Sequence, residues 1–560
     1  MTHRKFKLSL VFIIFVIGII LRVSYLRHGL PDFEVDDEGK FANPAMTITF
    51  NLPNLLKTRN LELLNTDYFY PHPHGLTNTL VVVFSAVTGF YKLSGVGSRV
   101  LSHADFIFVA RLFIAVVSGF IPLVIFWLLK KISGFKTAII GLLISALGYY
   151  FIYYSHVVSP YPICALLVSL FLWRFYEFIV QPNRRNWIFT SIALGLVAGF
   201  NFGVIVFAIP IGLTLIYLCL NQALSLKKTI IYSLAMGLIV GLGFLIISPL
   251  SVVNFRITLA ALSNVSNLQN IGAPSSGKLP TILEYFLGVN PEIISLQFLR
   301  PYSMVNAFGL PFAVLSLLSL VIALFSKNIF RIFLSLSFIC ALAFYSSHGS
   351  TNLRWLLPFL PIVVVLMTLS IADFSNLLRS QRVLIALVIV GVVLCTSLWQ
   401  VAFFLRSHSL PDTRELALQS IRGEISKDAI ILRPSFDSPP IWKYGYANNF
   451  VINHPTYGSS SQEQLPPVLS DVFCGFSTLN KERYLITVGS AANYVITSPS
   501  YSNEHPMTAG IWKKFYSNIT TWPKVGLFSP TLASPMTGTE VGVYKVPKDF
   551  CGPETFLCTI

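Results

Sequence analysis

The 560-residue sequence is 54% hydrophobic and only 11% charged, whereas about a quarter of the residues of a typical soluble domain are charged. Its mean hydropathy is +0.68, and its apolar residues form runs of about 20, the length that spans a hydrocarbon core. The composition excludes an ordinary soluble protein and predicts a polytopic membrane protein. The net charge of +16 is no sign of nucleic-acid binding, because no basic helix or aromatic platform accompanies it.

The first predicted element is a membrane helix over residues 7–26. The segment "MTHRKFKLSLVFIIFVIGIILRVSYL" has a basic start and a long apolar run, and no small-residue cleavage site follows it. We therefore expect a retained helix whose start lies in the cytoplasm.

Ten further crossings are predicted from the apolar runs, and the basic residues between them set the orientation. Every basic cluster falls on the cytoplasmic side when the N-terminus is inside, as the positive-inside bias requires. The predicted crossings are 105–129, 136–157, 160–179, 187–201, 202–220, 229–252, 304–325, 329–346, 353–372 and 383–403. The basic clusters are Lys130, Lys131 and Lys136; Arg184 and Arg185; Lys227 and Lys228; Lys327 and Arg331; and Arg379 and Arg382.

One more apolar stretch, "GLTNTLVVVFSAVTGFYKLSG" at 75–95, has the hydropathy of a crossing. If it crossed, every later basic cluster would lie outside. We therefore expect an interfacial or re-entrant helix within a long outer loop. The outer segments are then 27–104, 253–303 and 404–560, which hold both glycosylation-type triplets, at Asn264 and Asn518.

The chain changes character near residue 404. Pro, Gly and polar residues increase, and short strand-like runs appear, namely "DAIILRP", "RYLITVG", "NYVITS" and "EVGVYKVP". We expect an all-α membrane domain over 1–403 and a small α/β extracytoplasmic domain over 404–560. Three cysteines of the tail, Cys474, Cys551 and Cys558, allow one disulfide that the sequence does not assign.

The first outer loop opens with an unusual concentration of acid. "GLPDFEVDDEGKFANPAM" (29–46) holds five carboxylates within seven positions, in a chain with 24 acidic residues in all. A solvated acidic loop is the simplest interpretation. Ionisable groups close to the apolar phase are costly and tend to mark functional sites, so a site is the alternative.

The motifs resemble those of GT-C glycosyltransferases. The resemblance runs in order through Asp37-Glu38, Ala42 or Ala45, the aromatic-Pro loop "YPHPHG", "FVARLFIAVVSGFIPLVIFWLLKKISGF" (108–135), "YYFIYYSHVVSPYP" (149–162) and "NLRWLLPFLPIV" (352–363). It covers about 400 residues and is strongest with the polyprenyl-phosphate-sugar-dependent branch. That branch includes protein O-mannosyltransferases (glycosyltransferase family 39) and the aminoarabinose transferase of lipid A.

The resemblance implies an inverting transfer from a polyprenyl-phosphate sugar to an acceptor hydroxyl of a lipid, glycan or protein. Asp37 matches the acidic position of the family and would be the general base. Asp36 and Glu38 are the alternates. Closely spaced carboxylates repel, so one of them binds a proton more readily or a cation lies between them. A divalent cation, Mg²⁺ or Mn²⁺, is therefore a candidate cofactor, with Asp37 and His72 as candidate ligands.

Several other polar residues are candidates for substrate binding. Arg354 starts a crossing at the outer face, where it would either hydrogen-bond the donor phosphate or extend to the interface. Arg111 would bind substrate or hold the acidic loop by an ion pair. The remaining candidates are Tyr70, His72 and His74 of the aromatic-Pro loop, and His156.

One position departs from the family pattern. Where the family carries a second acidic residue, this chain has Ser159-Pro160-Tyr161-Pro162, which puts metal dependence in question; Glu284 and Glu292 are substitutes that the sequence offers. Two other functions remain as alternatives, a transporter or lipid flippase and a non-catalytic scaffold of the GT-C type. Few acidic residues fall in the predicted crossings, which disfavours a transporter. We expect a multi-pass protein of a prokaryotic plasma membrane.

Overall fold

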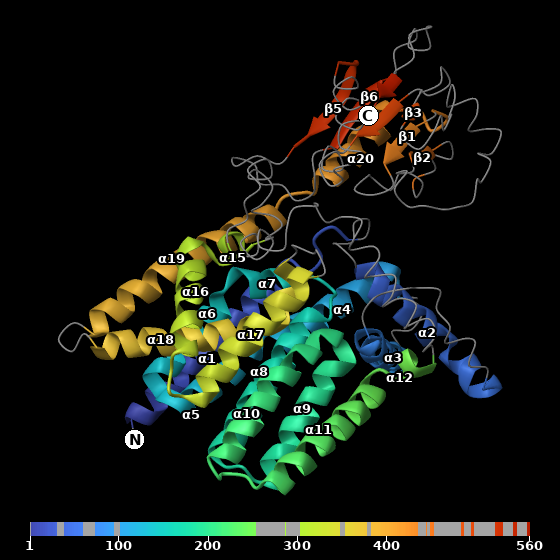
Figure 1. Ribbon diagram of the computed structural model, residues 1–560. Helices are drawn as coiled ribbons and strands as arrows, with labels where there is room; N and C mark the ends of the chain where they lie inside the picture. The colour runs from blue at the N-terminus through green and yellow to red at the C-terminus, as the bar shows by residue number, and fades with distance from the viewer. Residues whose placement is uncertain are drawn as a thin grey trace. The chain divides into compact units, whose positions relative to one another are not determined.

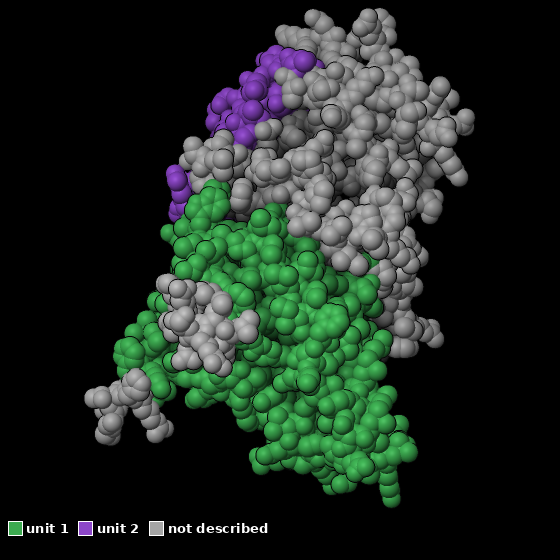
Figure 2. All heavy atoms as spheres, turned by 60° about the vertical axis from the view of Figure 1, so that its left-hand side comes forward, with its two compact units in different colours: residues 1–27, 34–404 green, residues 28–33, 405–560 purple. Residues whose placement is uncertain are grey.

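The computed structural model consists of two compact units, drawn in separate colours in Figure 2: residues 1–27 with 34–404, and residues 28–33 with 405–560. The structure describes residues 2–30, 38–59, 73–94, 101–253, 286, 303–347, 353–377, 382–429, 431–434, 444, 449–452, 483–485, 494–497, 521–529, 541–545 and 557–559. The assignment of residues 404–560 to a separate extracytoplasmic domain stays a prediction.

The first unit is built from helices, as the composition predicts (Figure 1). Its long helices are α1 (Thr2–Val23), α2 (Glu38–Thr58), α3 (Gly75–Leu93), α4 (His103–Ser118), α5 (Ile121–Ser133), α6 (Phe135–Leu147), α8 (Tyr161–Val180), α9 (Arg184–Phe200), α10 (Ala208–Leu220), α11 (Leu226–Ile247), α16 (Leu310–Leu324), α17 (Ile329–Ser347), α18 (Leu360–Leu377) and α19 (Arg382–His408). The short ones are α7 (Tyr149–Ser155), η2 (Phe202–Phe207), α12 (Pro249–Val253), α15 (Met304–Phe308) and η4 (Leu353–Phe359).

The number of candidate membrane spans is close to the prediction. Within the described part of the chain, nine segments are long and apolar enough to cross, or ten when the bent pair α6–α7 counts as one. The predicted polytopic α-helical class is therefore confirmed. Two of the eleven predicted crossings, 187–201 and 304–325, correspond to helices of 17 and 15 residues, α9 and α16. At 1.5 Å per residue these helices rise about 25 and 22 Å, less than a typical hydrocarbon core.

Helix α3 lies within the apolar stretch at 75–95, which we predict to be interfacial or re-entrant. It is one continuous 19-residue helix, and by length and apolarity it is among the nine candidate spans. Phe84 of α3 packs against Phe106 of α4, with ring centroids 4.9 Å apart. Its interfacial or re-entrant placement stays a prediction.

A buried arginine accompanies the break between α6 and α7. The two helices meet at 48° at Gly148, so the last carbonyls of α6 have no partner within the helix. Arg22 of α1, which is fully buried, donates from Nη1 to the carbonyl oxygen of Ala146 (2.9 Å) and from Nη2 to that of Ser145 (3.1 Å). The guanidinium group therefore ties α1 to the free end of α6.

Glycines allow α9 and α11 to approach closely where they run side by side (Figure 1). A Cβ atom at Gly243 of α11 would lie 2.9 Å from the backbone of Gly195 on α9. No larger residue fits at either position without moving the helices apart, so this contact depends on the two glycines.

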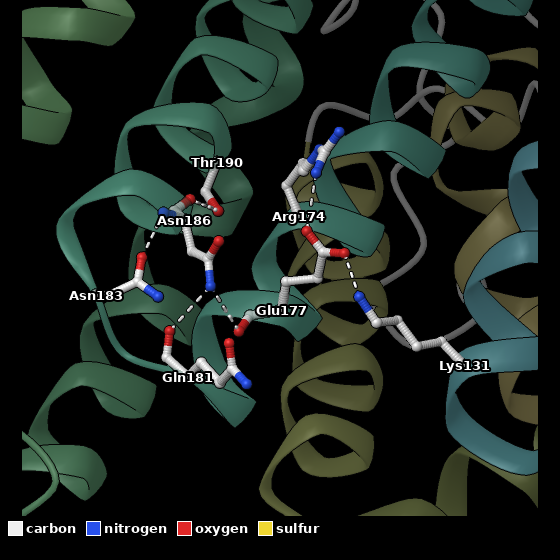
Figure 3. Close-up of polar contacts among 7 residues, drawn as sticks. All are labelled: Lys131, Arg174, Glu177, Gln181, Asn183, Asn186 and Thr190. Atoms are coloured by element: carbon white, nitrogen blue, oxygen red, sulfur yellow. Dashed lines mark hydrogen bonds and ion pairs between the residues drawn. The ribbon is translucent and has the colours of Figure 1, made fainter.

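A polar network closes the turn between α8 and α9 (Figure 3). Asn183 caps α9, because its side chain accepts a hydrogen bond from the backbone N–H of Asn186 at 2.9 Å. The Asn186 amide donates to the carbonyl oxygens of Glu177 (3.2 Å) and Gln181 (3.0 Å) at the end of α8. The Glu177 carboxylate pairs with Arg174, one helical turn away, and with Lys131 at the end of α5. The network therefore joins three helices at one end.

The second unit contains a helix packed on a sheet, so the predicted α/β fold of the tail is confirmed. The five-stranded sheet has the order β2-β1-β4-β6-β5; β1 pairs in parallel with β2 and β4, and β6 pairs antiparallel with β4 and β5. Leu418 and Ile421 of α20 are buried against Ile431, Ile496 and Val543 of the sheet. The bounds are α20 (Thr413–Glu424), β1 (Ile431–Pro434), β2 (Asn449–Ile452), β3 (Arg483–Leu485), β4 (Tyr494–Thr497), β5 (Lys524–Phe528), β6 (Val541–Lys545) and β7 (Leu557–Thr559).

Candidate functional site

The acidic stretch is anchored by a buried ion pair. Glu38, the first residue of α2, is fully buried, and Arg111 of α4 is 2% exposed. Arg111 donates from Nε to Oε1 of Glu38 at 2.8 Å and from Nη2 to Oε2 at 2.6 Å. This is the bidentate geometry in which guanidinium and carboxylate bind most strongly. Arg111 thus holds the acidic stretch by an ion pair, which is one of the two roles predicted for it.

The ion pair connects two further segments. Arg111 Nη1 donates to the carbonyl oxygen of Leu26, just after α1, at 2.8 Å. The backbone N–H of Val158, in the loop before α8, donates to Oε1 of Glu38 at 3.0 Å. The ends of α1 and α7 and the start of α2 therefore meet at α4. Glu38 accepts three hydrogen bonds in this arrangement, so its carboxylate is already engaged by the protein.

His156 lies beside this junction and is buried. Its Nε2 is 2.7 Å from the carbonyl oxygen of Ser24, and its Nδ1 is 2.8 Å from that of Ile152. Both ring nitrogens therefore face carbonyl oxygens, and these contacts tie the loop after α7 to the end of α1.

His74 is placed in a different contact. Its Nδ1 lies 2.9 Å from Oγ of Ser251 in α12, and its backbone N–H donates to the same oxygen at 3.0 Å. Ser251 in turn lies 2.6 Å from Oγ of Ser248. Burial lowers the pKa of His74. These contacts join the start of α3 to the end of α11 through α12.

Arg354 lies at the start of η4 among aromatic side chains. Its Cζ is 5.9 Å from the ring centroid of Trp355, which in turn lies 6.0 Å from Tyr161 and 5.9 Å from Tyr345. An arginine held against an aromatic ring keeps its donors oriented. Trp355, the ring beside Arg354, is thus held by α8 and α17.

Four of the predicted site residues, Asp36, Asp37, Tyr70 and His72, lie outside the described residues, as do Glu284 and Glu292. Their roles stay predictions. The residues that the structure describes contain no group of three or more His, Cys, Asp or Glu side chains placed to hold a metal ion. Among the acidic candidates, only Glu38 belongs to the described residues, and its two oxygens are bound to Arg111 and Val158.

Sequence reasoning missed a set of buried neutral polar groups near Arg354. The hydroxyl of Tyr150 faces Tyr154, and that of Tyr345 faces Asn201. The Ser159 hydroxyl makes no hydrogen bond with a described residue. A buried polar group without a partner costs about 1–3 kcal/mol. Asn201 is the last residue of the predicted crossing 187–201, and its polar side chain there was the only available signal. Arg22, a charge inside a predicted crossing, was also missed.

The fold is similar to that of two solved membrane transferases, as the motif resemblance predicts. The crystal structure of the aminoarabinose transferase ArnT from Cupriavidus metallidurans in the apo state is similar over 99% of this chain and 100% of that chain, at a TM-score of 0.51 and 14% sequence identity. The oligosaccharyltransferase of Archaeoglobus fulgidus, tethered with an acceptor peptide, is similar over 99% of this chain and 75% of that chain, at a TM-score of 0.50 and 13% identity. No protein-family model and no curated protein sequence matches the chain.

Proposed function

We propose that this protein is a membrane glycosyltransferase that moves a sugar from a polyprenyl-phosphate carrier to an acceptor hydroxyl. The observation that carries the proposal is the buried pair of Glu38 and Arg111, which anchors an acidic segment to the junction of α1, α2, α4 and the loop before α8. Burying two charges is costly, so the arrangement is better explained by positioning of the acidic segment than by stability alone. The GT-C fold and the carbohydrate chemistry of its similar structures agree with it.

The roles follow from this anchor. Glu38 is bound by three donors and acts as a positioning residue, so Asp37, directly before it in the chain, is our choice for the general base, with Asp36 as the alternate. Asp37 takes the proton of the acceptor hydroxyl as its oxygen attacks the anomeric carbon. The bond from that carbon to the phosphate oxygen breaks, the electron pair leaves with the polyprenyl phosphate, and the anomeric configuration inverts.

The leaving phosphate carries charge that a cation must stabilise. Arg354 is our candidate, because it is held against Trp355 near the same helix ends. A divalent cation, if the full acidic segment binds one, would add the same kind of stabilisation. The acceptor is a lipid, a glycan or a protein, and we propose that it reaches the site from the extracytoplasmic face of a plasma membrane.

The experiment is release of polyprenyl phosphate. Purified full-length protein is mixed with a polyprenyl-phosphate sugar and a cell-envelope extract as acceptor, and the released lipid phosphate is quantified. We expect turnover by the natural sequence and a loss of about 10²-fold or more in Asp37→Asn, which keeps the shape but not the basicity. The matched control is Asp373→Asn, near the C-terminal end of α18, where the carboxylate pairs with Arg331. Unchanged turnover in Asp37→Asn would reject Asp37 as the base.

A further inference from the structure

Six cations gather at one end of the helical unit, where α5 and α8 end and α6 and α9 begin. Lys131 of α5 and Arg174 of α8 bind the same carboxylate, that of Glu177, and Asn186 at the start of α9 donates to the Glu177 carbonyl oxygen (Figure 3). Helix α6 follows α5 after the single residue Gly134. We call this surface the basic end, and its members are Lys130, Lys131, Lys136, Arg174, Arg184 and Arg185.

The basic end has a large excess of positive charge. Glu177 is the only acidic residue between Asp105 and Glu284 in the sequence. Its side chain is 14% exposed and pairs with Lys131 and Arg174. The other four cations are exposed, and none of them pairs with a carboxylate of the described residues. Six cations and one carboxylate therefore leave five positive charges uncompensated at this surface.

The helix dipole does not explain where these cations lie. A cation is favourable near the C-terminus of a helix and unfavourable near its N-terminus. Lys130 and Lys131 lie in the last turn of α5, as the dipole favours. In contrast, Lys136 is the second residue of α6, Arg184 and Arg185 are the first two of α9, and neither helix has an acidic residue in its first turn. Three cations thus lie where their own helices disfavour them, a cost that an anion outside the chain would offset.

The basic end also has the features of a membrane–water boundary. Two candidate membrane spans, His103–Ser133 and Tyr161–Val180, end at this surface. Lys130 Nζ lies 4.4 Å from the ring centroid of Trp127, which is 43% exposed. Trp is enriched where the hydrocarbon core meets the headgroups, and long cationic side chains extend from there toward the headgroups. The cations are therefore placed at the depth of lipid phosphates.

Two guanidinium groups of this surface share one aromatic ring. The Cζ atoms of Arg174 and Arg185 lie 5.4 and 5.8 Å from the ring centroid of Phe189, which is 41% exposed. A guanidinium group held against a ring keeps its donors oriented. Arg174 uses Nη1 for Glu177, whereas Arg185 makes no ion pair with a described residue. Arginine donors oriented in this way are suited to phosphate oxygens.

We propose that the basic end binds acidic phospholipids of the membrane, whose headgroup phosphates pair with Lys130, Lys136, Arg184 and Arg185. An acidic phospholipid has a net negative charge that a zwitterionic one lacks, so it complements the uncompensated cations at headgroup depth. In the orientation that the sequence predicts, this end faces the cytoplasm, and the cytoplasmic leaflet is the one with a negative surface potential. The inference is independent of the proposed glycosyl transfer.

The test is equilibrium binding of three tail-labelled lipids to the purified full-length protein in a neutral detergent: phosphatidylglycerol, phosphatidylcholine and polyprenyl phosphate. We expect phosphatidylglycerol to bind at least about tenfold more tightly than phosphatidylcholine, since each cation near a headgroup contributes about fivefold. The variant with Lys130→Gln, Lys136→Gln, Arg184→Gln and Arg185→Gln should lose at least about tenfold in phosphatidylglycerol binding and keep its phosphatidylcholine binding. All four side chains are exposed, so their replacement leaves the packing of the helices intact.

The matched control is Lys57→Gln with Lys92→Gln, which removes two exposed cations in the last turns of α2 and α3. We expect it to bind phosphatidylglycerol like the natural sequence. Equal binding of phosphatidylglycerol and phosphatidylcholine by the natural sequence overturns the proposal, and this comparison needs no variant. A control that loses as much binding as the fourfold variant overturns the location. Polyprenyl phosphate that binds more tightly than phosphatidylglycerol, and is lost in the fourfold variant, assigns the surface to another anionic lipid and overturns the proposal as well.

Discussion

At the scale of single residues, the pair of Glu38 and Arg111 determines how the acidic segment enters the fold. Both side chains are buried, and the carboxylate accepts from Arg111 twice and from Val158 once. Loss of one partner leaves a buried charge uncompensated, which costs more than loss of both. The sequence predicts the pair as one of two roles for Arg111, but not that Glu38 is the partner, since five carboxylates compete within seven positions.

Because loss of one partner costs more than loss of both, substitutions of Arg111 and Glu38 test the buried ion pair. Arg111→Met should destabilise the protein by about 3–5 kcal/mol, because Glu38 would remain buried and charged. The double variant Arg111→Met with Glu38→Gln should recover most of that loss, which a merely local packing defect would not show. Thermal unfolding in detergent measures both variants against the natural sequence. An Arg111→Met variant as stable as the natural protein would contradict the buried ion pair.

At the scale of helices and strands, the sequence predicts what periodicity and hydropathy can encode. All four strand-like runs of the tail become strands, β1, β3, β4 and β6. Three strands, β2, β5 and β7, were not predicted, because their short runs lack a clear alternation. Helix packing is harder still. The α9–α11 contact depends on Gly195 and Gly243, and a glycine in an apolar helix does not reveal which face it occupies.

Two neighbouring glycines of α11 provide a matched comparison. A Cβ at Gly243 would meet the α9 backbone at 2.9 Å, whereas nothing lies within 4 Å of a Cβ at Gly241. Gly243→Ala should therefore destabilise by about 1–3 kcal/mol through overpacking, while Gly241→Ala should be neutral or stabilise by up to about 1 kcal/mol through helix propensity. Thermal unfolding of the two variants gives the comparison. Equal effects would show that α9 and α11 do not pack through this face.

At the scale of the whole molecule, the sequence predicts the polytopic helical class and the α/β tail, and the structure confirms both. It does not predict the ring contacts that link Tyr150 to Tyr345 through Tyr154, Tyr161 and Trp355. The two end residues are nearly 200 positions apart, and each is an ordinary aromatic residue of an apolar segment. Long-range contacts of this kind arise from tertiary packing, which local patterns do not record. The orientation of the chain in the membrane stays a prediction.

The central claim is that a lipid-linked sugar binds beside the Glu38–Arg111 pair and the loop before α8. The most direct measurement uses a polyprenyl-phosphate mannose with a photoreactive diazirine on the sugar, bound to the purified protein, irradiated and mapped by mass spectrometry of peptides. The account predicts labelling of peptides from residues 28–46 and 149–162, suppressed by excess unlabelled donor. Competable labelling confined to other parts of the chain, with neither segment marked, would contradict it.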